Sequence, residues 1–232
     1  MQLFYAPNIA VDQELPEEEA KHALRVLRLS EGDEIEITDG KGFFYKALIQ
    51  STNPRHCEVE IIEKKEQSPL WDFRLHIAVA PTKSIDKTEW FCEKATEIGI
   101  NEITFLNCRF SERREIKEAR LEKILVSAIK QSQKATLPGL NGMTDFQTFI
   151  KKPFEGRRFI AHCQEGLKFL LKQTYHQSED ALVLIGPEGD FSLEEINAAL
   201  AQGFEPISLG NSRLRTETAA LAAVHTFHVL NQ

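Results

Sequence analysis

The sequence predicts an α/β fold in which a small β-rich unit, residues 1–70, precedes a parallel-sheet domain, residues 73–232. In the first part, short segments with alternating apolar and polar residues are separated by tight-turn sequences, a pattern typical of small barrels. From residue 75 onward, predicted strands and helices alternate along the chain, which indicates a parallel sheet. The segment 181–185, Ala-Leu-Val-Leu-Ile, is apolar throughout, as strands covered on both faces are.

The β-rich unit contains one predicted helix and three predicted strands. The helix begins at Pro16, carries acidic residues in its first turn where they suit the helix dipole, and places four apolar residues on one face. A turn signal, Asp39-Gly40-Lys41-Gly42, separates the first two strands. The strands are 34–38, 43–49 and 57–62, the apolar helix face is Ala20, Ala23, Leu24 and Leu27, and the polar residues 64–72 are the linker.

The parallel-sheet domain is predicted to alternate strands and helices to the end of the chain. Asp86 with Glu89, and Ser192 with Glu195, each match a capping box, so a helix is expected to begin at both places. The predicted strands are 75–80, 103–106, 159–162, 181–185 and 206–209; the predicted helices are 86–99, 115–134, 192–203 and 217–230, with a short one after 162.

The net charge of −7 averages over unlike segments. Residues 1–72 carry −7, residues 73–173 carry +6, and residues 174–232 carry −6. The total excludes a uniformly basic nucleic-acid binder, whereas the middle segment is suited to face phosphate. On the predicted helix, Arg113, Lys117, Arg120 and Lys123 recur at three- and four-residue steps and form either a phosphate-contacting stripe or, because glutamates are interleaved, an ordinary solvated face.

Cysteine and histidine spacing indicates neither a disulfide framework nor a metal site. His225 and His228 stand three residues apart without a third ligand in sequence, so no metal is expected. There is no signal-peptide pattern and no stretch near the ~18 apolar residues of a membrane span, so a cytoplasmic protein is expected. The four cysteines form no C-x-x-C pair and are expected to be free thiols: Cys57, Cys92, Cys108 and Cys163.

Two polar loops follow predicted strands and run directly into predicted helices. The first spans Leu184-Ile-Gly-Pro-Glu-Gly-Asp-Phe-Ser192, and the second spans Leu209-Gly-Asn-Ser-Arg-Leu-Arg-Thr-Glu-Thr-Ala219. Ligands of open α/β sheets bind beyond the carboxyl ends of the strands, and glycines let backbone approach them closely. The alternatives are a simple tight turn for the first loop and, for the second, an ordinary helix start capped by Thr216 or Thr218.

These loops, GPEGDFS at 186–192 and LGNSRLRTETAALAA at 209–223, closely resemble the C-terminal motifs of the RsmE family. The resemblance continues at His22-x-x-x-Val-Leu-Arg28-Leu, at Lys94-Ala-Thr-Glu-Ile-Gly99, and at Gln131-Ser132 followed by Pro138. It implies a PUA-like β-barrel followed by a SPOUT domain whose parallel sheet contains a trefoil knot. Asp190 stands where the family has glycine; it is expected to begin a helix, where a carboxylate is tolerated, so the fold is expected to be kept.

The resemblance further implies a homodimeric methyltransferase that uses S-adenosylmethionine. Its substrate would be N3 of a uridine in 16S ribosomal RNA of the small ribosomal subunit, position 1498 in the standard numbering. Two alternatives stay open: a catalytically silent RNA-binding protein, and a SPOUT enzyme that acts on another RNA site.

The residues expected to act lie in the two loops and in the basic segments. Arg215, with Arg213 as second candidate, would stabilise charge that develops on the uracil, because arginine offers fixed donors and does not deprotonate. Glu217 would orient that arginine or accept the proton. The cofactor is expected against Leu184, Ile185, Gly186, Pro187, Glu188, Gly189, Leu209, Gly210, Leu214, Arg215, Thr216, Glu217, Thr218 and Ala219, and RNA against His22, Arg25, Arg28, Arg109, Arg113 and Arg114.

Overall fold

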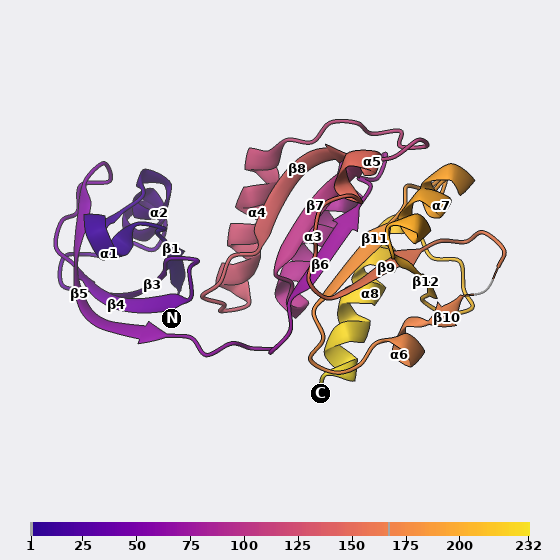
Figure 1. Cartoon of the computed structure of the whole chain (residues 1–232). Helices are drawn as coiled ribbons and strands as arrows, with labels where there is room; N and C mark the ends of the chain where they lie inside the picture. Colours follow the sequence, from indigo (N-terminus) through magenta and orange to yellow (C-terminus); the bar gives the residue numbers. More distant parts are fainter. Residues whose placement is uncertain (1, 167) are drawn as a thin grey trace. The chain divides into compact units, whose positions relative to one another are not determined.

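The computed structural model describes residues 2–166 and 168–232 and confirms the predicted α/β class (Figure 1). The chain divides into two compact units. The first contains the residues up to Pro69 together with Val126–Leu137; the second contains Leu70–Leu125 and Pro138–Gln232.

The first unit is built on a five-stranded sheet in the order β1-β3-β4-β5-β2. β1 and β3 are parallel and the other neighbours are antiparallel, as in a half-barrel. The three longer strands confirm the predicted ones, whereas the two shorter strands are too short to carry a periodic signal. The strands are β1 (Leu3–Tyr5), β2 (Glu14–Leu15), β3 (Glu34–Thr38), β4 (Phe43–Ile49) and β5 (Cys57–Glu66).

The predicted linker begins too early, because β5 continues to Glu66. Lys64 pairs with Tyr45 across the sheet, and its ammonium group lies 3.9 Å from the ring centroid of Phe43. A lysine stem covers aromatic surface while its charge stays in water. A charged segment is therefore a strand here, and the chain leaves the sheet only after Glu66.

The predicted helix at Pro16 is confirmed in its first half only. α2 (Glu17–Lys21) continues as a π-helix, η1 (His22–Val26), after the short helix α1 (Ile9–Asp12). Ala20 and Ala23 are fully buried, but Leu27 is 38% exposed and does not belong to the buried face. The wider π turn, closed by a bond from the Leu27 amide to the His22 carbonyl, changes the period and rotates Leu27 off that face.

The second unit contains a seven-stranded, all-parallel sheet in the order β10-β12-β9-β11-β6-β7-β8. β8 was not predicted, because Gly-Leu-Asn-Gly-Met-Thr-Asp is rich in glycine and polar residues; it lies at the sheet edge. The trefoil knot stays a prediction. The strands are β6 (Leu75–Val79), β7 (Glu102–Asn107), β8 (Gly139–Asp145), β9 (Arg157–Ala161), β10 (Phe169–Leu170), β11 (Ala181–Ile185) and β12 (Glu205–Ser208).

Helices cover both faces of this sheet (Figure 1). α5 and α7 pack on one face through a buried cluster that includes Phe146, Leu184 and Ile196. α3 and α8 pack side by side, and Phe227 of α8 contacts Phe159 of β9. The helices are α3 (Ile85–Ile98), α4 (Glu118–Gln131), α5 (Phe146–Phe149), α6 (Leu171–Thr174), α7 (Leu193–Ala201) and α8 (Thr216–Leu230).

The two predicted capping boxes have different outcomes. At α7 the box is confirmed: the Ser192 hydroxyl accepts from the Glu195 amide at 3.2 Å, and the Glu195 carboxylate accepts from the Ser192 amide at 2.8 Å. At α3 it is wrong, because the helix already begins after Ser84 and Asp86 lies inside its first turn. The residue spacing of a capping box is present at both places, and only the backbone conformation shows at which of them a helix begins.

The four cysteines of the chain are free thiols, as predicted. Three of them are buried, and only Cys163 is exposed. Burial raises the pKa of Cys92 to about 12. Across residues 2–166 and 168–232, no cluster of three metal-binding side chains occurs, and no helix is long and apolar enough to cross a membrane.

We predict that His76 makes the stability of the protein depend on pH. Burial lowers the pKa of this histidine to about 4, and its Nε2 lies 2.8 Å from the Thr104 hydroxyl. An unfolded histidine takes up a proton near pH 6.5, so this contribution to stability is complete above that pH and is lost as the pH falls. Between pH 8 and pH 5, the free energy of unfolding measured by urea titration should fall by about 2 kcal/mol less in His76→Gln than in the wild type. Equal losses in both proteins would contradict the assignment.

Candidate functional site

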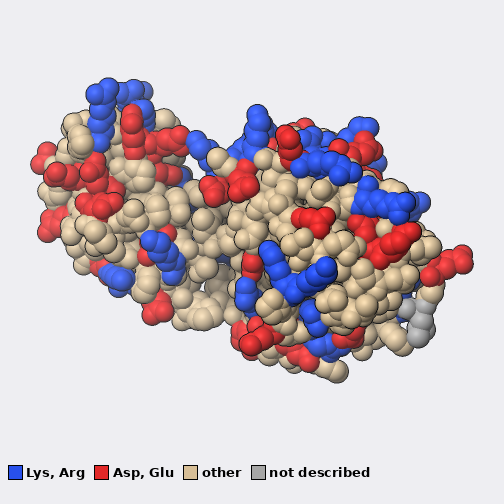
Figure 2. All heavy atoms as spheres, turned by 45° about the horizontal axis from the view of Figure 1, so that its top comes forward, with Lys and Arg blue, Asp and Glu red and all other residues tan. Residues whose placement is uncertain are grey.

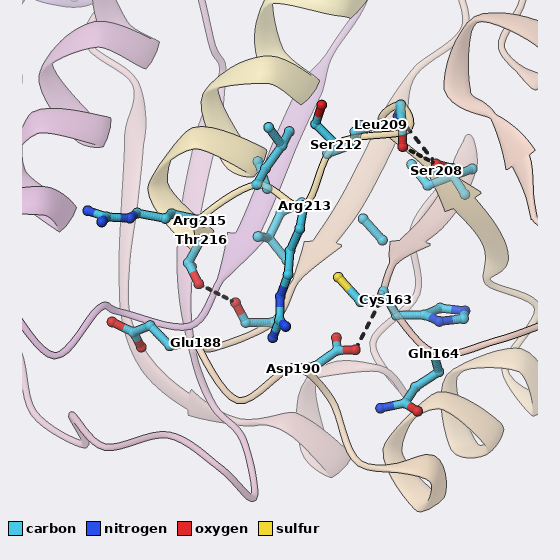
Figure 3. Close-up of a pocket in the computed structure, with 18 of the residues that line it drawn as sticks. Cys163, Gln164, Glu188, Asp190, Ser208, Leu209, Ser212, Arg213, Arg215 and Thr216 are labelled. Carbon is cyan, nitrogen blue, oxygen red and sulfur yellow. Dashed lines mark hydrogen bonds between the residues drawn. The ribbon is translucent and has the colours of Figure 1, made fainter.

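A cavity of about 800 Å³ lies at the carboxyl ends of the central strands of the parallel sheet (Figure 3). Its walls come from three loops, which follow β9, β11 and β12, and from the first turn of α8. The size is that of a site for a small organic ligand. The lining residues are 161–164, Lys168, 185–190, 207–216 and Ala219.

One buried hydrogen bond joins the two loops that the sequence singled out. The Thr216 hydroxyl donates to the carbonyl oxygen of Gly186 at 3.1 Å. Thr216 is the first residue of α8 and is only 5% exposed, while the helix N-cap is Arg215, which makes no side-chain capping bond. The alternative of an ordinary threonine N-cap is therefore wrong for both Thr216 and Thr218.

The loop after β11 is held in place by a hydrogen bond to another loop and by close packing against a buried ring. The Glu188 carboxylate accepts from the Lys83 amide at 2.9 Å, which ties this loop to the one after β6. Phe191 is fully buried, and a Cβ on Gly186 would lie 3.1 Å from its ring. A larger residue than glycine would press on this ring, so the chain keeps glycine here for packing as much as for ligand access.

The prediction that Asp190 begins a helix is wrong, because this residue precedes Ser192, the N-cap of α7, by two residues. Its φ of +66° lies in the left-handed region, which favours glycine and, after it, asparagine and aspartate. One carboxylate oxygen accepts from the amide of Cys163, and the other accepts from the amide of Phe191, each at 2.9 Å. The side chain thus holds the loop after β9 against the loop after β11.

The structure brings most of the predicted cofactor residues to the cavity. Exceptions are Leu184, which is buried inside the sheet, Thr218, which is exposed on α8, and Glu217, which is 9% exposed with its carboxylate 3.8 Å from the Lys87 ammonium. Those at the cavity are Ile185, Gly186, Pro187, Glu188, Gly189, Leu209, Gly210, Leu214, Arg215, Thr216 and Ala219. Arg213, which was predicted as a catalytic candidate and not as a cofactor residue, also lines the cavity.

Sequence reasoning missed the wall formed by the loop after β9. His162, Cys163, Gln164 and Lys168 have no motif, although the rule that ligands bind beyond strand ends applied to this strand too. The Lys168 ammonium donates to the carbonyls of His162 and Gln164 and closes the loop on itself. Burial lowers the pKa of His162, so this imidazole is neutral at pH 7.

Arg213 and Arg215 leave the same loop in different directions. In Figure 3 the Arg213 side chain extends into the cavity toward Asp190, whereas Arg215 extends away from it. Both side chains are exposed, and no hydrogen bond or ion pair holds either one within residues 2–166 and 168–232. The site therefore presents one guanidinium to a ligand inside the cavity and another to a group outside it.

The predicted basic stripe does not form, because α4 begins at Glu118 and leaves Arg113 in the preceding loop. Arg113 donates to the carbonyls of Thr82 and Lys83 at 3.0 and 2.7 Å. Arg120 is paired with Glu89 at 2.6 Å. On the face in Figure 2, basic side chains form several separate groups with acidic side chains between them.

The remaining RNA candidates differ in how they are held. Arg109 is paired with Glu194 at 2.9 Å, and Arg114 is exposed. In the first unit, His22 and Arg25 lie in the π-helix, and Arg28 follows it with a φ of +59°.

Comparison with known proteins identifies the family to which the chain belongs. The family described as the RNA methyltransferase domain matches residues 69–228, and the RNA methyltransferase PUA domain matches residues 15–62. The chain belongs to the RNA methyltransferase family. The predicted resemblance to its RsmE members is confirmed: the chain is 27% identical over 220 residues to ribosomal RNA small subunit methyltransferase E of Bacillus subtilis, covering 89% of this chain and 86% of the relative.

Solved structures of RNA methyltransferases superpose along the whole chain. A probable rRNA-methyltransferase from Porphyromonas gingivalis has a TM-score of 0.95 at 44% identity and covers 100% of this chain and 98% of its own. Ribosomal RNA small subunit methyltransferase E from Neisseria gonorrhoeae, bound to S-adenosyl methionine, has a TM-score of 0.88 at 27% identity with the same coverage. This methyltransferase therefore shares both units with its relatives.

We predict that Thr216→Val weakens both the fold and the cavity. Valine has the shape of threonine without the hydroxyl, so the buried Gly186 carbonyl loses its partner at a cost of about 1–3 kcal/mol. The unfolding free energy from urea titration should fall by that amount, and calorimetry should show weaker binding of S-adenosylmethionine. Thr216→Ser keeps the hydroxyl and is the matched control. Equal binding by the valine and serine variants would contradict this role.

We predict that Asp190 holds Cys163 through its carboxylate, independently of overall stability. Asp190→Gly relaxes the left-handed backbone but removes both hydrogen bonds. Amide exchange at Cys163 should accelerate about tenfold, as expected for loss of about 1.4 kcal/mol locally, while the melting temperature stays within a few degrees. Asp190→Asn keeps an acceptor and should exchange as the wild type does. Unchanged exchange in the glycine variant would remove this role.

Proposed function

We propose that this methyltransferase transfers a methyl group from S-adenosylmethionine to N3 of a uridine in 16S ribosomal RNA, position 1498 in the standard numbering. The observation that carries the proposal is the cavity itself: the two loops that match the RsmE motifs close around it and are tied by the Thr216–Gly186 bond. Curated relatives along nearly the whole chain bear the name ribosomal RNA small subunit methyltransferase E.

The residues of the cavity fit this cofactor. About 800 Å³ is sufficient for a nucleoside joined to an amino acid, and the loops offer backbone groups at Gly186, Gly189 and Gly210. Asp190 and Glu188 place carboxylates where a cationic ligand is favoured, and Arg213 offers a guanidinium to a ligand carboxylate. When bound, the cofactor supplies an electrophilic methyl group.

The remaining chemistry falls to the target side of the site. A neutral uracil imide is a poor nucleophile, so its N3 proton must leave and the resulting charge on the ring oxygens must be stabilised. Arg215 extends away from the cavity and is free to donate to those oxygens without losing a proton. Glu217, next to Arg215 in the chain, would orient that arginine or accept the N3 proton; its carboxylate lies 3.8 Å from the Lys87 ammonium and outside the cavity.

The same family assignment supports a wider proposal about RNA contacts, assembly and location. We propose that the PUA unit contacts RNA through His22, Arg25 and Arg28, and that Arg109 and Arg114 add contacts beside the cavity. We further propose a knotted, homodimeric enzyme that works in the cytoplasm on the small ribosomal subunit. Sedimentation equilibrium measures the dimer directly.

The proposal is tested by locating the transferred methyl group. The protein is incubated with methyl-labelled S-adenosylmethionine and either free 16S rRNA or unmodified small subunits, and the labelled nucleoside is identified by digestion and mass spectrometry. Label on N3 of one uridine supports the proposal. Label on ribose or on another base indicates a SPOUT enzyme for another site, and RNA binding without cofactor binding indicates a catalytically silent protein.

We predict that replacing Arg215 lowers catalysis, whereas replacing Arg213 weakens cofactor binding. Arg215→Ala should lower kcat for rRNA by at least about a hundredfold, as removal of one charge-stabilising donor does, with binding of S-adenosylmethionine unchanged. Arg213→Ala should chiefly raise the Kd for the cofactor. Circular dichroism checks that both variants fold. Near-normal turnover by Arg215→Ala would refute its catalytic role.

A further inference from the structure

Phe110 places an exposed aromatic ring beside the cavity but outside it. The residue follows β7, and 47% of its surface is exposed. Gly189, which lines the cavity, packs against it so closely that an added Cβ would lie 3.0 Å from the Cβ of Phe110. The loop after β7 therefore contacts the cavity-lining loop after β11 at Phe110.

The backbone around this ring is fixed by buried groups. The Cys108 amide donates to the Ser111 hydroxyl at 3.0 Å, and the Ser111 amide donates to the Cys108 carbonyl at 3.1 Å. The Arg109 amide donates at 2.8 Å to the carboxylate of Glu195, which is only 5% exposed. The loop is thus ordered on both sides of Phe110, so the backbone position that carries the exposed ring is fixed.

Such exposure has a cost, because burying a phenylalanine side chain stabilises a protein by about 1.5–3 kcal/mol. A single exposed apolar side chain is common on protein surfaces, so the role of Phe110 has to be argued from its surroundings. Leu193, 61% exposed in the first turn of α7, lies next to Ser192 and follows the same loop as Gly189. Two exposed apolar side chains thus flank the cavity-lining loop after β11 in the chain or in space: Leu193 follows that loop, and Phe110 contacts it at Gly189.

The charges around Phe110 select the class of ligand. The Arg109 guanidinium lies 5.6 Å from the ring centroid, and Arg114 is exposed nearby in sequence. Glu194 pairs with Arg109 at 2.9 Å, and Glu112 pairs with Lys83 at 2.8 Å. All four side chains are largely exposed, and such pairs contribute little free energy, so a phosphate group can replace Glu194 as the partner of Arg109. An exposed ring combined with guanidinium groups suits an unpaired nucleotide, whose base stacks on the ring and whose phosphate pairs with arginine.

We propose that Phe110 stacks against an unpaired base of the RNA substrate next to the target uridine, and that Arg109 and Arg114 contact its phosphates. The proposal rests on the proposed function, because it assigns a nucleotide-binding surface to the same site. Phe110 does not line the cofactor cavity. It is therefore a specificity-determining residue for RNA and not for S-adenosylmethionine.

The test compares Phe110→Leu with Phe110→Trp in the full-length protein. Leucine keeps an apolar side chain of similar size without a ring face, whereas tryptophan enlarges that face. We measure anisotropy of a fluorescein-labelled oligouridylate, KM for small subunits, and the calorimetric Kd for S-adenosylmethionine. Base stacking is worth about 1–3 kcal/mol, so the leucine variant should raise the RNA Kd and the KM by about tenfold, while tryptophan matches or improves on the wild type and the cofactor Kd stays constant.

The outcomes separate this proposal from the proposed function. Equal RNA affinity for phenylalanine, leucine and tryptophan would overturn the stacking role, even if the wild type methylates uridine. A change in sedimentation on leucine substitution would show that the ring contacts a second copy of the chain and would also overturn it. A wild type that binds RNA in this ring-dependent way but methylates nothing would contradict the proposed function and leave the stacking surface standing.

Discussion

The site depends on one buried hydrogen bond, from the Thr216 hydroxyl to the Gly186 carbonyl. A buried carbonyl without a partner is costly, so the loop after β11 and the start of α8 are constrained to meet at this point. The sheet order makes this meeting possible, since β11 and β12 lie on either side of β9. The loop after β9 then lies between the loops that follow β11 and β12, and the three loops enclose the cavity.

Other side chains extend this constraint across the carboxyl edge of the sheet. Glu188 holds the loop after β6, Glu195 holds the loop after β7, and Asp190 holds the loop after β9. Each is a carboxylate that accepts from a backbone amide distant in sequence. A site built this way is preorganised, because little has to move when the ligand and the target approach. Acidic residues of a segment with net charge −6 thus have a structural use that the charge alone did not reveal.

Much of this arrangement was predictable from local patterns. The strands at 34–38, 43–49 and 181–185 and the capping box at Ser192 follow from periodicity and turn chemistry, and the two loops that line the cavity were expected at strand ends. What sequence reasoning could not predict depends on long-range contacts. Arg113 lies outside α4, in a loop that is bonded to the carbonyls of Thr82 and Lys83, and the wall at 161–164 belongs to the site only because β9 lies between β11 and β12. Neither is visible in a window of neighbouring residues.

A crystal structure of the protein with S-adenosylmethionine would show whether this hydrogen bond organises the cofactor site. We expect the cofactor in the cavity at residues 185–190 and 207–216, with its methyl group open toward the side on which Arg215 lies and the Thr216–Gly186 bond intact. A cofactor bound elsewhere would refute this assignment, as would a complex in which the Thr216 hydroxyl has left the Gly186 carbonyl.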